Sequence, residues 1–281
     1  MGKSKKWIIT GTVLLGSGLM ICGTSFTIMG FDWEKLSTVK FVTNTYEIAD
    51  PFANIRIDAD TASLSFLPSE DGTCKVICHE EGDDPHKAEV QNDTLTIERK
   101  NNKSLRLFGI GFETESPGIT VYLPEDTYKT CTIETDTGDI TLQDLSAGDM
   151  QLGSDTGRIK LTNIELSDDL DIEENTGDIV LQNVTCRNLK AEGDTGDLRL
   201  TDVTASGEFR LETDTGDIVF DGCDADAIHA ETDTGDVTGT LLSDKVFYAD
   251  TDTGSVDVPA STTGGRCEIE SDTGDIRLKI E

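Results

Sequence analysis

The residues of this chain that could do chemistry are aspartates in a repeated Asp-Thr-Gly tripeptide, first complete at Asp136, Thr137 and Gly138. Two copies of this tripeptide form the active site of aspartic proteases, where neighbouring carboxylates share one proton. Here eight Thr-Gly copies follow one another every 19 or 20 residues, and polar pairs such as Glu134-Thr135 precede them. A protease has apolar strand residues at that place, so the context argues against a proteolytic dyad.

The tripeptide is instead typical of a tight turn. Glycine adopts a positive φ without strain, aspartate accepts a hydrogen bond from the backbone N–H two residues on, and threonines can stack in a ladder. The leading aspartate is replaced only by Asn175, which keeps the acceptor. The sequence thus predicts structural turns at Asp136, Gly138, Asp155, Gly157, Gly177, Asp194, Gly196, Asp214, Gly216, Asp233, Gly235, Asp252, Gly254, Asp272 and Gly274.

Further carboxylates recur two residues before and three residues after the leading aspartate, and these could bind cations. If the repeats stack in register, such carboxylates lie ~4.8 Å apart and repel one another by about 1 kcal/mol per pair in water. Ca²⁺ prefers oxygen ligands and would relieve this repulsion. The alternative is a solvated acidic edge without metal, because the spacing matches no known calcium loop. The predicted calcium edge consists of Glu134, Asp139, Glu173, Asp178, Glu192, Asp197, Glu212, Asp217, Glu231 and Asp236.

A scaffold with a period of about 20 residues must position these rows, and such a period marks a solenoid. Each repeat has two short apolar alternations, as in Leu170/Ile172 and Ile179/Leu181, which predict two strands per turn of the chain. Because parallel crossovers are nearly always right-handed, we expect an all-β, right-handed parallel β-helix. Stacking in chain order would place Asp250 between Glu231 and Glu270 in the glutamate row. An outer apolar column would run from Leu145 through Cys223 to Leu242.

The remaining sequence predicts a membrane anchor and a leading β region. Residues 1–6 are a basic, cytoplasmic N-terminus, and the uncharged run at 7–29 is long enough to cross a bilayer as a helix. Lysines before this run and acidic residues after it favour a single-pass protein of the cell membrane with an extracytoplasmic C-terminal domain. A cleaved signal peptide is the alternative. Residues 30–46 are a connector, 47–130 form the N-terminal β part with a degenerate rung around Ala62, and 131–281 form the eight-rung solenoid.

Charge and the scarcity of catalytic residue types narrow the function. A net charge of −32 opposes binding of nucleic acid and favours cations or basic partners. The seven cysteines are odd in number and irregularly spaced, which is not the pattern of a disulfide scaffold. The three histidines, His79, His86 and His229, are scattered, and His229 is expected to face solvent. No Ser/His/Asp or Cys/His set is evident, so we expect no enzyme.

Several of these residues resemble a known family. Ile119-Thr120-Val121-Tyr122-Leu123-Pro124, then Ile133-Glu134-Thr135 and the repeated Thr-Gly-Asp-Ile, resemble the bacterial "putative adhesin" domain of unknown function. This is the exported β-solenoid type also found in LiaG-like envelope proteins. The resemblance covers residues 55–281 and implies a surface or envelope location without an established chemistry, since fold alone does not define function.

Together these features predict a membrane-anchored, extracytoplasmic, non-catalytic β-solenoid that serves as an adhesion or binding, spacer or envelope-stress module. Its expected partners are the membrane, through the N-terminal helix, and an envelope component or cationic molecule. No cofactor is required, and Ca²⁺ is the one that the acidic edge would take. Two alternatives are an outer domain that senses divalent cations or cationic peptides, and a calcium-dependent carbohydrate-active enzyme. Release of sugar from envelope glycans would favour the enzyme, and salt-sensitive binding of basic peptides would favour the sensor.

Overall fold

The computed structural model describes residues 16–18, 20, 24, 41–82, 85–99 and 116–281. The chain separates into two compact units, one of Met1–Phe41 and Lys103–Glu115, the other of Val42–Asn102 and Ser116–Glu281. The predicted basic N-terminus lies outside the described residues, as do nearly all of the predicted anchor at 7–29 and most of the connector at 30–46. In the described part of the chain, we find no helix with the length and apolar character needed to span a membrane.

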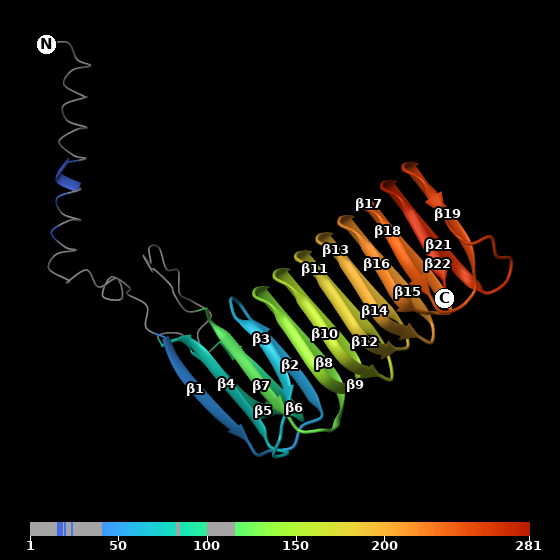
Figure 1. Cartoon of the computed structure of the whole chain (residues 1–281). Helices are drawn as coiled ribbons and strands as arrows, with labels where there is room; N and C mark the ends of the chain where they lie inside the picture. Colours follow the sequence, from blue (N-terminus) through green and yellow to red (C-terminus); the bar gives the residue numbers. More distant parts are fainter. Residues whose placement is uncertain (1–15, 19, 21–23, 25–40, 83–84, 100–115) are drawn as a thin grey trace, which may run out of the picture. The chain divides into compact units, whose positions relative to one another are not determined.

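The second unit is a parallel β-solenoid, as the repeats predict (Figure 1). A middle rung consists of β11 (Leu170–Thr176) and β12 (Ile179–Cys186), joined by the turn at Gly177 and Asp178. The next rung repeats this arrangement with β13 (Leu189–Thr195) and β14 (Leu198–Ala205). Equivalent residues pair directly, so that Ile179 lies opposite Leu198 and Glu173 opposite Glu192. In-register stacking therefore turns each repeat position into a column.

The strands form two series along the stack. The first series is the one that carries the glutamate row, and its order is β5 (His86–Gln91), β6 (Thr94–Arg99), β2 (Asn54–Ala59), β8 (Thr127–Thr137), the second half of β9 (Ile140–Thr156), β11, β13, β15 (Glu208–Thr215), β17 (Ala227–Thr234), β21 (Gly265–Thr273) and β19 (Lys245–Thr253). The second series is β1 (Phe41–Ile48), β4 (Cys74–Glu81), β7 (Gly118–Leu123), β3 (Ser63–Pro68), the first half of β9, β10 (Ile159–Leu166), β12, β14, β16 (Ile218–Cys223), β18 (Val237–Leu241), β22 (Ile276–Ile280) and β20 (Val256–Asp257).

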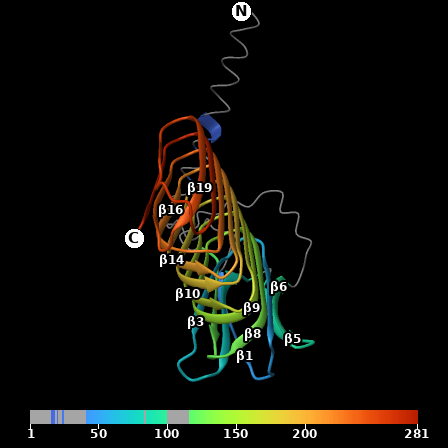
Figure 2. The ribbon, with the colours of Figure 1, turned by 90° about the vertical axis from the view of Figure 1, so that its right-hand side faces the viewer.

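The core is the narrow space between these two series, seen along the stack in Figure 2. Apolar columns such as Leu170/Ile172 and Ile179/Leu181 are buried along its length, because alternate strand residues point inward. Cys74, Cys78, Cys131, Cys186, Cys223 and Cys267 are free and buried. Burial raises the pKa of the Cys131 thiol to about 12, so this cysteine acts as a small apolar side chain.

The order of the rungs departs from chain order at both ends, which corrects one prediction. At the C-terminal end, β21 and β22 lie between the β17/β18 rung and the β19/β20 rung (Figure 1). Glu270 therefore lies next to Glu231, and Asp250 lies beyond Glu270. The inserted order buries Ile276 and Leu278 of β22 and leaves the smaller Val256, which pairs with Ile276, 44% exposed at the end of the stack. Burying the larger aliphatic side chains favours this order.

The opposite end shows a similar insertion. The degenerate rung, β2 and β3, lies between the β6/β7 rung and the first Thr-Gly rung, with Leu64 opposite Ile140. β4 and β5 pair antiparallel to β7 and β6 at this end. These antiparallel strands occupy the edge that a parallel stack would otherwise leave unpaired, which is how solenoids cap their cores.

The outer apolar column also ends differently from the prediction. A register shift between Phe220 and Cys223 places Leu241, rather than Leu242, opposite Cys223. Leu241 is buried and Leu242 is 47% exposed. The inward role predicted for Leu242 is therefore wrong, because the shortened loop of this rung changes which residue points inward.

Candidate functional site

The Thr-Gly turns are shaped by the close approach of successive rungs. The Gly157 N–H donates to the Thr176 carbonyl at 3.1 Å, and the Gly177 N–H donates to the Thr195 carbonyl at 2.9 Å. A Cβ atom on Gly177 would lie 1.7 Å from the Gly157 carbonyl oxygen, so no larger residue fits. Gly138 also has a φ of 143°, as predicted for the turn glycines. At Gly235, Gly254 and Gly274 the close approach alone excludes a side chain.

The leading aspartates stand beside these turns and form an exposed column. Within residues 116–281 we find no leading aspartate that accepts a hydrogen bond from the N–H two residues on, which is the bond expected from the sequence. Instead, the Asn175 amide Nδ2 donates to Asp155 Oδ1 on the neighbouring rung at 3.1 Å. The pKa of Asp136 is raised, first by partial burial and then by the carboxylates of Asp60, Asp155 and Asp58. The column thus concentrates negative charge along the stack.

The row three residues after the leading aspartate is a hydrogen-bonded ladder. Wherever this position is an aspartate, one carboxylate oxygen accepts a hydrogen bond from the backbone N–H at the same position of the next rung in the stack. The Asp217 N–H donates to Asp197 at 2.8 Å, and the Asp236 N–H donates to Asp217 at 2.9 Å. The same bond joins Arg158 to Asp139, Asp197 to Asp178, Asp275 to Asp236 and Ser255 to Asp275. These carboxylates therefore have a structural role that needs no metal.

The glutamate row, two residues before the leading aspartate, lies on the outer face of the first strand series. Because residues i and i+2 of a strand share a face, this row and the leading aspartates form adjacent columns. Some glutamates pair with cationic side chains two residues earlier on the same strand face: Lys190 Nζ lies 2.7 Å from Glu192 Oε2, and Arg210 pairs with Glu212. We call the glutamate and leading-aspartate columns together the acidic face, which includes Glu134, Glu173, Glu192, Glu212, Glu231, Glu270, Asp250 and the leading aspartates.

A hollow opens in the acidic face where Gly153 interrupts the glutamate column. Its volume is about 220 Å³, and it is lined by carboxylates of both columns, including Glu134, Asp155 and Glu173. No residue of the aspartate ladder lines this hollow. The structure therefore separates the predicted calcium edge into two parts, the glutamates on the open face and the aspartates Asp139, Asp178, Asp197, Asp217 and Asp236 in the ladder.

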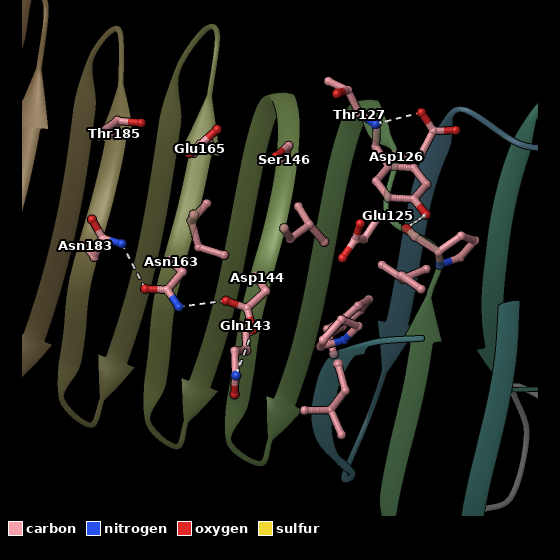
Figure 3. A pocket seen from close by; sticks show the side chains of 18 residues that line it. Glu125, Asp126, Thr127, Gln143, Asp144, Ser146, Asn163, Glu165, Asn183 and Thr185 are labelled. Atoms are coloured by element: carbon pink, nitrogen blue, oxygen red, sulfur yellow. Dashed lines mark hydrogen bonds between the residues drawn. The ribbon is translucent and has the colours of Figure 1, made fainter. Parts of the chain in front are cut away.

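A second feature, missed from the sequence, is a groove of about 490 Å³ along the second strand series (Figure 3). Asp144, Asn163 and Asn183 line it at equivalent positions, each with a positive φ of 53° or 54°. The Asn163 amide donates to Asp144 at 2.6 Å, and the Asn183 amide donates to Asn163 at 2.9 Å. The recurrence of Asp or Asn eight residues after the leading position was the available signal. Since these groups bond to one another, they stabilise the corners of these three rungs.

Two of the three histidines, His86 and His229, lie close to carboxylates. His86 is buried, its Nδ1 lies 2.6 Å from Glu80 Oε2, and its backbone N–H donates to the same oxygen at 2.7 Å. Burial alone would raise the pKa of Glu80, but these hydrogen bonds stabilise the carboxylate, so its pKa is lowered. His229 does not simply face solvent, because carboxylates flank both of its ring nitrogens. Glu212, His229 and Glu231 each offer a ligand atom within 4.8 Å of the others.

The fold and the surface thus define a class of protein, the parallel β-solenoids with Thr-Gly turns and an acidic face. The chain belongs to the Toastrack family (DUF4097), whose model matches residues 52–281. This confirms the resemblance drawn from the Gly-Asp-Ile repeats. No protein with a curated description matches the chain.

Solved structures resemble the chain in fold. A "putative lipid binding protein" from Parabacteroides distasonis has 14% sequence identity and a TM-score of 0.52, with 86% of this chain and 98% of that chain covered. A "putative adhesin" from Bacteroides fragilis has 17% identity and a TM-score of 0.44, with 85% and 97% covered. At 14% identity, the similarity to the Parabacteroides distasonis protein shows the fold alone.

Proposed function

We propose that this protein is a membrane-anchored, extracytoplasmic, non-catalytic binding module whose acidic face takes a cationic partner of the cell envelope. The observation that carries the proposal is the in-register stacking of two adjacent carboxylate columns on one face. Stacked rungs repeat this charge every ~4.8 Å, which suits an extended basic polymer or peptide better than a compact ligand.

The repetition of one chemistry along the face also favours binding over catalysis. An active site requires a small set of different groups with separate roles at one place. The acidic face instead offers equivalent carboxylates on successive rungs, including Glu173, Glu192, Glu212 and Glu231. The uncharged run at 7–29 and the lysines before it are the features that support a single-pass anchor in the cell membrane.

Binding of a lysine-rich peptide to the full chain, followed by isothermal titration at low and high salt, tests the proposal. We expect replacement of Glu192, Glu212 and Glu231 by Gln to weaken binding by about tenfold or more, and salt to weaken it further. The matched control replaces Asp221, Glu165 and Asp257 by their amides on the second strand series and removes the same charge. Equal weakening by both triple variants would contradict a specific role of the acidic face.

Calcium is a second candidate ligand, favoured by the hollow at Gly153. Carboxylate oxygens of Glu134 and Glu173 line it, and oxygen ligands of this kind suit Ca²⁺. Calcium should then raise the melting temperature of the full chain relative to the protein in chelator, and Glu134→Gln with Glu173→Gln should abolish the increase. A melting temperature that calcium leaves unchanged at low salt would refute this binding.

A further inference from the structure

We propose that Glu212, His229 and Glu231 form a binding site for a divalent transition metal of the zinc type. Their ligand atoms lie within 4.8 Å of one another, and all three side chains are half-buried on neighbouring strands β15 and β17. This inference goes beyond the cationic-partner proposal and does not depend on it, because it rests on a nitrogen ligand present at one rung only of the acidic face.

The separation of the three groups is close to what such a metal requires. Zinc bonds of about 2.0–2.2 Å in tetrahedral geometry place ligand atoms roughly 3.5 Å apart. His229 Nε2 already lies 3.6 Å from Glu231 Oε2. Glu231 lies directly opposite Glu212 in the strand register, and a carboxylate oxygen of Glu212 lies within 4.8 Å of the other two ligand atoms.

The second ring nitrogen of His229 also lies near a carboxylate. His229 Nδ1 lies 3.8 Å from Glu268 Oε2 on β21. A carboxylate on the far nitrogen orients the imidazole and increases its basicity, which strengthens metal binding through the near nitrogen. We assign Glu268 as a positioning residue that must move closer to hydrogen-bond this nitrogen, since it now pairs with Arg266 at 2.8 Å. It lies beside His229 only because β21 is inserted beside β17.

The chemistry of the column explains why this rung differs from its neighbours. The equivalent positions on the two preceding rungs hold Lys190 and Arg210, whose ammonium and guanidinium groups pair with glutamates and cannot bind a metal. Imidazole nitrogen suits zinc and related metals, whereas Ca²⁺ takes oxygen ligands. Arg210 competes for Glu212, but both side chains are partly exposed, and such surface pairs exchange readily.

Titration of the full chain, prepared without a histidine tag, with Zn²⁺ and with Co²⁺ tests the site. We expect one site with a Co²⁺ absorption spectrum typical of mixed nitrogen and oxygen ligation. His229→Gln should weaken Zn²⁺ binding by at least tenfold and remove that spectrum, and Glu231→Gln should also weaken binding. Glu268→Gln should have a smaller effect, because this residue acts through the imidazole.

His79→Gln is the matched control. It removes a histidine of β4 that hydrogen-bonds Thr43, at the opposite end of the stack from this site. It should leave Zn²⁺ binding unchanged. Binding of the lysine-rich peptide should persist in His229→Gln, which separates this inference from the proposed function. Melting temperatures without metal check that the variants fold. Unchanged Zn²⁺ affinity in a folded His229→Gln variant, or equal loss in His79→Gln, would overturn the assignment.

Discussion

At the residue scale, Glu174 is a carboxylate in a column of small side chains. Its neighbours on adjacent rungs are Ser154 and Gly193. Glu174 is 1% exposed, and its Oε1 accepts a hydrogen bond from the Thr176 N–H at 3.1 Å. Burial raises the pKa of Glu174 to about 7. Between pH 4.5 and about 7, the folded protein therefore holds a proton here that its unfolded chain would release.

This raised pKa predicts that the protein loses stability as the pH rises. Between the ordinary glutamate pKa of 4.5 and about 7, the folded state binds more protons than the unfolded state, so the free energy of unfolding falls with increasing pH. Glu174→Thr should remove the Glu174 contribution to this dependence and stabilise the protein above pH 7 by about 2–3 kcal/mol. Urea unfolding at pH 5 and pH 8 measures it, with exposed Glu165→Thr as the control. A slope between pH 5 and pH 8 that is the same in Glu174→Thr and in the unaltered protein would contradict the assignment.

The turn glycines support a second prediction at this scale. Gly177→Ala would place Cβ against the Gly157 carbonyl oxygen, a backbone atom that cannot rotate away. We expect a loss of more than about 3 kcal/mol in the free energy of unfolding, or failure to fold. Gly153→Ala is the matched control, because its Cβ would meet no atom closer than the Glu134 Cγ at 3.9 Å. Similar stability of the two variants in urea unfolding would show that the turns can open.

At the scale of elements, the aspartate ladder joins successive turns through charge-assisted hydrogen bonds. Asp217 takes part in two of them, as acceptor from the Asp236 N–H and through its own N–H to Asp197. Its carboxylate therefore satisfies a backbone donor that neither strand series can reach. This role accounts for the aspartates of the row without any bound cation.

Asp217→Ala should lower the free energy of unfolding by about 2 kcal/mol, since the Asp236 N–H loses its acceptor. Asp217→Asn keeps an acceptor oxygen and removes only the charge, so its loss should be smaller. Chemical denaturation of both variants, without calcium, makes the comparison. If the amide variant were as unstable as the alanine variant, charge rather than hydrogen bonding would hold the ladder together.

At the scale of the whole molecule, the inserted rung decides how the C-terminal end is held. β19 and β20 pair with β21 and β22, which follow them in the chain but lie inside them in the stack. The last residues of the chain thus belong to the interior of the solenoid. In a solenoid built in chain order they would form its cap.

Truncation after residue 263 should therefore also destabilise residues that remain in the shortened chain. It deletes β21 and β22, so the β19/β20 rung loses the strands on which it packs. We expect limited proteolysis with mass spectrometry to show rapid cleavage between residues 243 and 263, while truncation after residue 242 leaves a stack protected through β18. Equal protection of residues 243–263 in the full and shortened chains would contradict the observed rung order.

Much of the fold could be predicted because the period is strong and local. Apolar pairs such as Leu170/Ile172 alternate with polar residues, and a one-residue slip would expose every one of them, so the register follows from the pattern. The turn glycines could be predicted equally well, since no larger residue fits against the Gly157 carbonyl oxygen at Gly177. The candidate site was less predictable. The glutamate and aspartate rows are both carboxylates that recur once per repeat, and only the hydrogen bonds between rungs show that the aspartates have a structural role.

The sequence by itself determined the rung, its two strands, its turn and the columns that stacking creates, because these depend on residues within about 20 positions of one another. Only the tertiary structure decided which rung lies beside which, because the repeats share one pattern and any of them can stack on any other. The inserted order buries Ile276 and Leu278 and leaves the smaller Val256 at the exposed end of the stack. That order brings Glu268 and Glu270 beside His229 and Glu231, where chain order would have placed Tyr248 and Asp250.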